Sequence, residues 1–250
     1  MYIKTYVDIF QKRGLQFAEA CRLYAPAIAP EVGAFLGFAN LLEGETVLDA
    51  PASGAFLSRY VEVPNINLIA LDPCPALSEL AGSLVKQSYC APLSNMPFQD
   101  GHFDKVLCLA GLHHEPALAK FFEEAFRVIK PNGRLIIAEV DEATAPAKFL
   151  NGFVNAHSSL GHQGLFFSSL YIDSLKNAGF MINENQYKSY HWIFESNKKM
   201  AEAIAMMFGI DQATPEQVLK AVEGILGTEQ LSNGCVGMRW GLRFVSCIKS

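Results

Sequence analysis

Positive charge is scarce in this sequence. Its 250 residues include 20 Lys and Arg against 25 Asp and Glu, which gives a formal net charge of −5, and no run of basic residues occurs. Because phosphate contacts need clustered Lys and Arg, a nucleic acid is disfavoured as the principal partner. We therefore expect the partner to be a small molecule.

Long apolar runs are also missing. No uninterrupted apolar stretch reaches the ~18 residues of a membrane span, so we expect no membrane partner. The start, Met1–Tyr6, lacks the apolar core of a signal peptide. The six cysteines include no C-x-x-C pair, which favours free thiols over disulfides or a zinc site. We therefore expect a cytoplasmic chain that binds no metal.

The sequence does contain a strand, a bend of small residues and the start of a helix within residues 46–57. Val47 and Leu48 suit the centre of a sheet, and Asp49 follows them where strand ends meet a ligand crevice. Small neighbours and Gly54, which tolerates a positive φ, leave room for a ligand beside the backbone. An ordinary strand-to-helix turn is equally compatible with this pattern.

Strand and helix signals alternate along the chain. A second apolar run, starting at Asn67, also ends in a carboxylate, Asp72, at the offset from Asp49 that a βαβ unit gives. This alternation predicts an α/β, Rossmann-like, doubly wound parallel sheet. Further strands are expected at Lys105–Leu109, Arg134–Val140, Gln186–Phe194 and Val236–Ile248. Helices are expected within 1–43 and at Ala55–Tyr60, Leu77–Val85, Phe121–Ile129, Phe149–His157, Tyr171–Ala178 and Pro215–Leu226.

Three later stretches carry a more specific pattern. They read Met96-Pro97-Phe98-x-Asp100-x-x-Phe103-Asp104-x-Val106, Leu112-His113-His114 and Phe126-Arg127-Val128-Ile129-Lys130-Pro131-Asn132-Gly133-Arg134-Leu135. Together with the bend after Asp49, they resemble class I S-adenosylmethionine (SAM)-dependent methyltransferases of the small-molecule, ubiquinone-biosynthesis type. The resemblance covers roughly residues 40–142.

The resemblance implies a seven-stranded sheet, mostly parallel with an antiparallel last strand, and SAM as the cofactor. It assigns the methionine end of SAM to Asp49 and the bend, the ribose to Asp72, and the sulfonium to the loop after the fourth strand. Where the family often has an adenine-binding acid, this chain has Pro92, so backbone groups or nearby polar side chains would contact the adenine. The residues assigned to SAM are Asp49, Ala50, Ala52, Ser53, Gly54, Asp72, Pro73, Leu93, Ser94, Asn95, Ala110 and Gly111.

Histidines are the candidates for acid–base chemistry. Paired histidines can be bases or metal ligands. In the family the pair belongs to the wall of the site, so we expect a catalytic role for His113 and a structural role for His114. His162, between Gly161 and Gly164, is the first candidate for a general base, because a neutral imidazole can remove a proton from an acceptor. A loop-capping histidine is the alternative.

Segments outside the matched region would shape the acceptor site. We expect one domain of residues 1–250, with an N-terminal helical cap (1–43), a SAM-binding core (44–142) and substrate-side segments (143–170 and 195–232, the latter a helical insert). The candidates for substrate contacts are Tyr6, Arg13, His157 and His162. Arg13 would meet a substrate carboxylate. Plain packing against the sheet edge is the alternative for the cap.

The sequence thus favours methyl transfer from SAM to an O, N or C atom of a small acceptor, in a monomer or homodimer. Two alternatives remain open. The same fold can host SAM-dependent chemistry without methyl transfer, such as cyclisation, because fold does not fix reaction. The chain could also be a degenerate, non-catalytic member that binds a partner.

Overall fold

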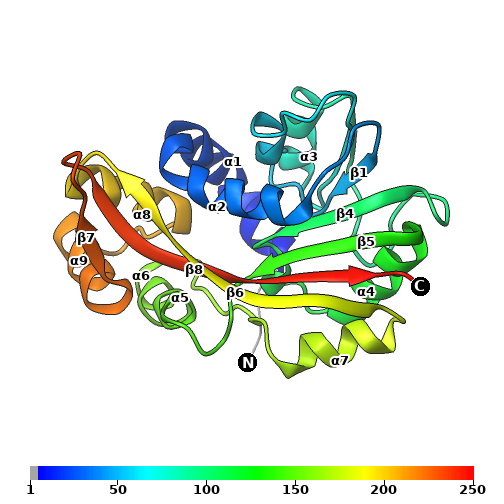
Figure 1. Cartoon of the computed structure of the whole chain (residues 1–250). Coiled ribbons are helices and arrows are strands. Elements are labelled where there is room, and N and C mark those ends of the chain that lie inside the picture. The colour runs from blue at the N-terminus through cyan, green and yellow to red at the C-terminus, as the bar shows by residue number, and fades with distance from the viewer. Residues whose placement is uncertain (1–4) are drawn as a thin grey trace.

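The structure, a computed structural model, describes residues 5–250. Eight strands form a sheet in the order β3-β2-β1-β4-β5-β8-β6, and β7 pairs with β8 (Figure 1). Neighbouring strands among β1 to β5 are parallel, whereas β8 is antiparallel to β5, β6 and β7. The strands are β1 (Thr46–Asp49), β2 (Asn67–Leu71), β3 (Gln87–Tyr89), β4 (Phe103–Leu109), β5 (Ile129–Glu139), β6 (Met181–Phe194), β7 (Thr228–Gln230) and β8 (Val236–Ile248).

Helices lie on both faces of the sheet, with α1 and α2 on one side and α4 and α7 on the other (Figure 1). The long helices are α1 (Tyr6–Leu23), α2 (Ala25–Ala39), α3 (Pro75–Gly82), α4 (Leu118–Val128), α7 (Ser169–Asn177), α8 (Asn197–Phe208) and α9 (Pro215–Ala221). The short ones are η1 (Phe56–Arg59), η2 (Leu112–His114), α5 (Ala145–Lys148), η3 (Phe149–Val154), α6 (Asn155–His157) and η4 (Val222–Leu226).

The central parallel strands β1 and β4 each contribute to two hydrophobic cores, because successive side chains point to opposite faces of a sheet. In β1, Val47 packs into the core that contains α2 and α8, and Leu48 packs into the core that contains α4 and α7. In β4, Leu107 and Val106 divide in the same way. Strands buried on both faces explain the continuous apolar runs in the sequence. The predicted doubly wound, mostly parallel fold is confirmed.

The structure corrects several predicted elements. The helix expected at Ala55–Tyr60 is only the single turn η1. It begins after Ala55, because Ser53, Gly54 and Ala55 all have positive φ and are not helical. The short strands β3 and β7 were not predicted, since neither has an apolar run. Strand β6 begins five residues earlier than expected, at Met181 rather than Gln186. Its first half is an exposed edge strand, which needs no apolar pattern.

Two simpler expectations can also be compared with the structure. All six cysteines are free, and four of them are buried. Within residues 5–250, every helix is too short or too polar to cross a bilayer.

A buried carboxylate joins α2 to the antiparallel end of the sheet. Glu31 of α2 is 7% exposed and accepts hydrogen bonds from Tyr190 Oη (2.9 Å) and Trp192 Nε1 (3.2 Å) of β6. Burial raises the pKa of Glu31 to about 7, against the opposing effect of these two donors. The carboxyl group therefore carries a proton in the folded chain at a pH where it is ionised in the unfolded chain.

This difference predicts how stability varies with pH. Since Glu31 binds its proton more tightly in the folded state, its contribution to the free energy of unfolding falls as the pH rises from about 4.5 to about 7, by at most about 3 kcal/mol. Glu31→Gln removes this titration, so urea unfolding at pH 5 and pH 8 should show a smaller loss of stability than the wild type.

The matched control is Glu195→Gln, which alters an exposed glutamate just after β6. It should keep the pH dependence of the wild type. An equally steep loss of stability in Glu31→Gln would show that the Glu31 carboxyl is ionised in the folded chain throughout this range.

Candidate functional site

A cavity of about 100 Å³ lies where α1 meets the loops after β1 and β4. Ser53 comes from the loop after β1, and Ala110 comes from the loop after β4, so the cavity is at the carboxyl ends of the parallel strands. Ligands of open α/β sheets bind at this edge. The lining is mostly apolar and aromatic, and includes Phe10, Phe17, Ile28, Phe56, Leu109, Val140, Leu150, Trp192, Met207, Phe208 and Trp240.

Two acids lie buried beside this cavity. Asp72 is fully buried and accepts hydrogen bonds from Ser53 N (2.7 Å) and Cys74 N (2.9 Å), yet burial raises its pKa to about 6. Asp49 is 1% exposed, and its Oδ2 has no partner among the described residues. Burial, reinforced by the Asp72 charge, raises the pKa of Asp49 well above its usual range. A cation or hydrogen-bond donor placed here would relieve both acids.

The first helix covers Asp72. Tyr6 donates to Asp72 Oδ2 (3.1 Å), lies 3.2 Å from Ser53 Oγ, and stacks on Phe10 with 4.3 Å between ring centroids. Burial and the neighbouring Asp72 raise the pKa of Tyr6 well above its usual range, so the hydroxyl keeps its proton and acts as a donor. Tyr6 thus takes the acceptor position that the sequence assigned to the SAM ribose.

The turn after β4 is held by one carboxylate. Glu139, fully buried at the end of β5, accepts from Leu112 N (3.0 Å) and His113 N (3.2 Å) through Oε2. Its Oε1 lies 2.8 Å from His113 Nδ1 and accepts from Val140 N. A carboxylate accepts hydrogen bonds, so His113 Nδ1 is the donor, and in the neutral tautomer the lone pair is on Nε2.

His162 reaches the same cavity from a distant segment. Its Nδ1 lies 3.1 Å from Asn151 Oδ1, which also accepts from Gly164 N (2.8 Å), while Asn151 Nδ2 donates to Gly164 O (3.0 Å). These two backbone contacts fix the orientation of the amide, so His162 Nδ1 donates and Nε2 is free. The segment is held against η2, the turn after β4, by the 2.7 Å hydrogen bond from Leu165 N to His113 O.

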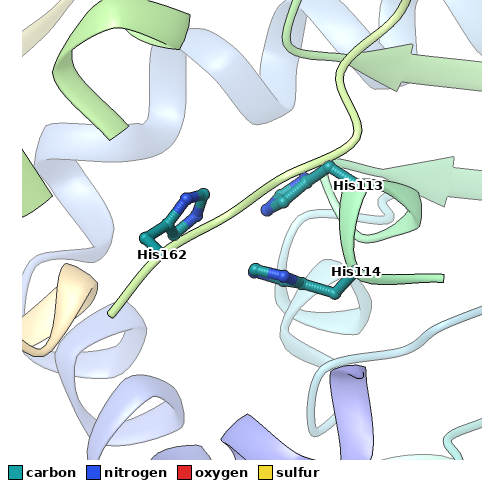
Figure 2. Close-up of side chains that lie close together, drawn as sticks. All are labelled: His113, His114 and His162. Carbon is teal, nitrogen blue, oxygen red and sulfur yellow. The ribbon is translucent and has the colours of Figure 1, made fainter. Parts of the chain in front are cut away.

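The three imidazoles come together at the cavity, and their rings point toward a common space (Figure 2). The ring centroids are 4.2 Å apart for His113 and His114, 4.9 Å for His114 and His162, and 5.4 Å for His113 and His162. Burial, with smaller contributions from His113 and Arg13, lowers the pKa of His114 and of His162 well below the usual range. Both rings are therefore neutral at pH 7.

Arg13 already has hydrogen-bond partners within the chain. It lines the cavity, but its guanidinium donates to the backbone carbonyls of Met206 and Met207, near the carboxyl end of α8. Burial lowers the pKa of Arg13 to about 10, so it remains charged at pH 7. The cation interacts favourably with the negative end of the α8 dipole and ties α1 to the helical insert. A contact from Arg13 to a substrate carboxylate stays a prediction.

The cavity contains part of the predicted site. The predicted residues that line it are Tyr6, Arg13, Ser53, Ala110, His113 and His162. The others lie in neighbouring loops and strand ends without lining it, and their assignment to SAM stays a prediction. They are Asp49, Ala50, Ala52, Gly54, Asp72, Pro73, Leu93, Ser94, Asn95 and Gly111.

Two histidines have surroundings that their assignments do not anticipate, and both assignments stay predictions. His157 was expected to contact substrate, but its Nδ1 donates to Phe153 O (2.9 Å), its ring stacks on Phe153 at 4.3 Å, and it does not line the cavity. One helical turn separates the two residues, so the His157 ring makes its contacts within its own helical segment. His114 was expected to be only structural, yet it lines the cavity. The sequence analysis also missed Glu139, although its carboxylate follows an apolar strand just as Asp49 and Asp72 do.

The chain is similar to known methyltransferases. Residues 48–137 match the methyltransferase domain family. The chain is 31% identical to the demethylmenaquinone methyltransferase of Tropheryma whipplei over 114 residues, which cover 44% of this chain and 46% of that protein. It is 30% identical to the ubiquinone/menaquinone biosynthesis C-methyltransferase of Citrifermentans bemidjiense over 90 residues, 33% of this chain and 38% of that one. The chain thus spans less than half the length of these relatives.

The chain carries a class I SAM-dependent methyltransferase domain. Solved structures share the fold over nearly its whole length. A SAM-dependent methyltransferase from Thermotoga maritima has a TM-score of 0.65 at 15% identity, covering 98% of this chain and all of that one. The [4+2]-cyclase SpnF has a TM-score of 0.64 at 15% identity, covering 100% and 97%. SAM is the cofactor of the domain family.

The hydrogen bond from Tyr6 to Asp72 should stabilise the ligand-free chain and compete with a ligand for Asp72. Tyr6→Phe keeps the stacked ring but removes the donor to Asp72, so the free energy of unfolding of the ligand-free chain should fall by about 1–3 kcal/mol. A ligand that needs the same acceptor no longer has to displace this hydroxyl. S-adenosylhomocysteine, measured by calorimetry, should therefore bind about 3- to 10-fold more tightly.

Tyr171→Phe is the control, because it also removes one buried hydroxyl, whose hydrogen bond to Leu165 O is 3.0 Å long. It should lose stability without a change in affinity for S-adenosylhomocysteine. Weaker binding by Tyr6→Phe would mean that Tyr6 contacts the ligand instead of competing with it.

Proposed function

We propose that this chain transfers the methyl group of SAM to a small, largely apolar acceptor bound in the cavity. The observation that carries the proposal is the position of the cavity. It adjoins Ser53 and Ala110, which the family resemblance assigns to the methionine end and the sulfonium of SAM, and it contains neutral histidines. Aromatic side chains such as Phe10, Trp192 and Trp240 favour an acceptor with apolar or aromatic surface.

The residues at the strand ends fit SAM in two respects. Asp49 Oδ2 is buried without a partner in the described chain, and the α-ammonium group of SAM would supply one. Asp72 Oδ2 already accepts from a hydroxyl, that of Tyr6, so a ribose hydroxyl would suit the same position. Bound SAM supplies an activated methyl group on a sulfonium leaving group, so the protein needs no nucleophile of its own.

The chain's own residues then have three tasks. The apolar lining excludes water and orients the acceptor, which is the main contribution that a protein makes to such a transfer. His162 Nε2 or His113 Nε2, each with a free lone pair, takes a proton from the acceptor where one must leave. Glu139 and Asn151 hold these two rings in the required tautomer.

The described form is closed. A cavity of about 100 Å³ is well below the range of about 300–1,000 Å³ usual for ligand sites. Helix α1 supplies Tyr6, Phe10, Arg13 and Phe17 to the lining. A shift of α1 away from the strand ends would therefore enlarge the cavity and free Asp72 at the same time, and we infer that it accompanies ligand binding.

The acid at the end of β2 is the sharpest test of the cofactor site. Asp72→Asn replaces one acceptor oxygen by a donor, so affinity for S-adenosylhomocysteine should fall at least about 10-fold. Asp104→Asn is the control. Asp104 Oδ2 also accepts from a backbone N–H, that of Thr46 (2.9 Å), but at the opposite end of the parallel strands. Equal affinity in both variants would place the cofactor away from Asp72.

A labelled-methyl assay tests the reaction. The chain is incubated with SAM carrying a labelled methyl group and a panel of apolar hydroxy, amino and acidic-carbon acceptors, and label in the product is the expected result. The fold that the chain shares with SpnF makes cyclisation the second candidate, and an unlabelled rearranged product would indicate it. Absence of any calorimetric signal or thermal shift at millimolar SAM would instead indicate a non-catalytic binding protein.

A further inference from the structure

We propose that His113, His114 and His162 form a binding site for a divalent transition-metal ion of the zinc class. Their nearest ligand nitrogens lie within 4.8 Å of one another, and all three side chains are buried. Figure 2 shows the rings converging from two parts of the chain: the turn after β4 and the segment that contains His162. The inference goes beyond the proposed function, because it requires neither SAM nor methyl transfer. With an ion bound, the Nε2 lone pairs of His113 and His162 are occupied, so these rings take a proton from an acceptor only in the metal-free chain.

The hydrogen bonds leave lone pairs where a metal needs them. His113 Nδ1 donates to Glu139 and His162 Nδ1 donates to Asn151, so both rings present a bare Nε2. Metal-bound histidines usually donate their other N–H to a carboxylate or carbonyl oxygen in this way, which fixes the tautomer and the ring orientation. Glu139 is fully buried and itself held by backbone N–H groups.

The His114 ring gives a second line of evidence for the metal site. His114 is 5% exposed, and its Nδ1 has no hydrogen-bond partner within residues 5–250. A buried polar nitrogen without a partner costs about 1–3 kcal/mol, and a metal ion bound to His114 Nδ1 would offset this cost. Phe10 of α1 lies edge-on to His114, with 6.3 Å between the ring centroids.

To bind one metal ion, the three ligand nitrogens must move closer together. A tetrahedral ion with bonds of about 2.0–2.1 Å to nitrogen places its ligand atoms about 3.3 Å apart. The present separations, up to 4.8 Å, would close by rotation of the three side chains toward one another. Three neutral nitrogens select Zn²⁺, Co²⁺, Ni²⁺ or Cu²⁺ rather than Mg²⁺ or Ca²⁺, which prefer oxygen ligands.

The titratable side chains around the cluster include Arg13 and Glu31, which line the same cavity, and Glu139, which contacts His113. Arg13 is the nearby cation that lines the same cavity, and it is directed to the carbonyls at the end of α8. Glu139 contributes one negative charge through His113. Three protein ligands leave a fourth coordination position, and this position would open into the cavity, where an oxygen atom of a bound molecule or a water could occupy it.

Co²⁺ binding to the chain without an affinity tag provides the test. After dialysis against a chelator, we expect one Co²⁺ per chain, visible absorption typical of a tetrahedral nitrogen site, and displacement by Zn²⁺. His114→Gln and His162→Gln should each weaken Co²⁺ binding at least about 100-fold, since even loss of an outer partner costs 10- to 100-fold. His157→Gln, which alters a histidine outside the cavity, should bind as the wild type does.

Two results would overturn the metal site. One is no absorption change in the wild type up to millimolar Co²⁺. The other is equal Co²⁺ affinity in the wild type, His114→Gln and His162→Gln, which would place the ion elsewhere. Calorimetry with S-adenosylhomocysteine on the same metal-free samples keeps the two proposals separate, because it reports on the cofactor site alone.

Discussion

The buried carboxylate of Glu139 determines the shape of the candidate site. It accepts the backbone N–H groups of Leu112 and His113 and the imidazole N–H of His113, and so turns the chain back immediately after β4. Hydrogen bonds to a charged acceptor are stronger than those between neutral groups. This turn brings both His113 and His114 to the cavity, and His113 O in turn receives Leu165 N, which places the His162 segment beside them.

The second constraint is the burial of acids at the sheet edge. Asp49, Asp72 and Glu31 all have raised pKa values because burial disfavours their charged forms. Glu31 obtains two donors from β6, and Asp72 obtains Tyr6 and two backbone N–H groups, whereas Asp49 Oδ2 obtains none within the described chain. Unrelieved burial of this kind is common at functional sites, where a bound ligand can supply the missing partner. The ligand-free stability of the chain is reduced by the groups that would hold its cofactor.

The sequence predicts the sheet far better than the site. Runs such as that ending at Asp49 are buried on both faces, so composition alone identifies them, and β8 has the predicted limits, Val236–Ile248. Strand β3 escapes prediction because it is a polar edge strand of three residues. The site depends on contacts across long sequence separations. No local pattern reveals that His162 contacts His114, or that His157 bonds to Phe153 one turn away.

Helix α1 connects the parts that the sequence keeps apart. Tyr6 contacts the acid at the end of β2, Phe10 contacts the ring of His114, and Arg13 contacts the end of α8. These three residues lie on one face of α1, at the i, i+4, i+7 spacing that places side chains together. A rigid helix cannot release one contact and keep the other two unchanged. Displacement of Tyr6 from Asp72 by a ligand would therefore alter the surroundings of His114 and the anchor of the helical insert. A ligand that shifts this helix from the strand ends would thus also change access to the histidine cluster.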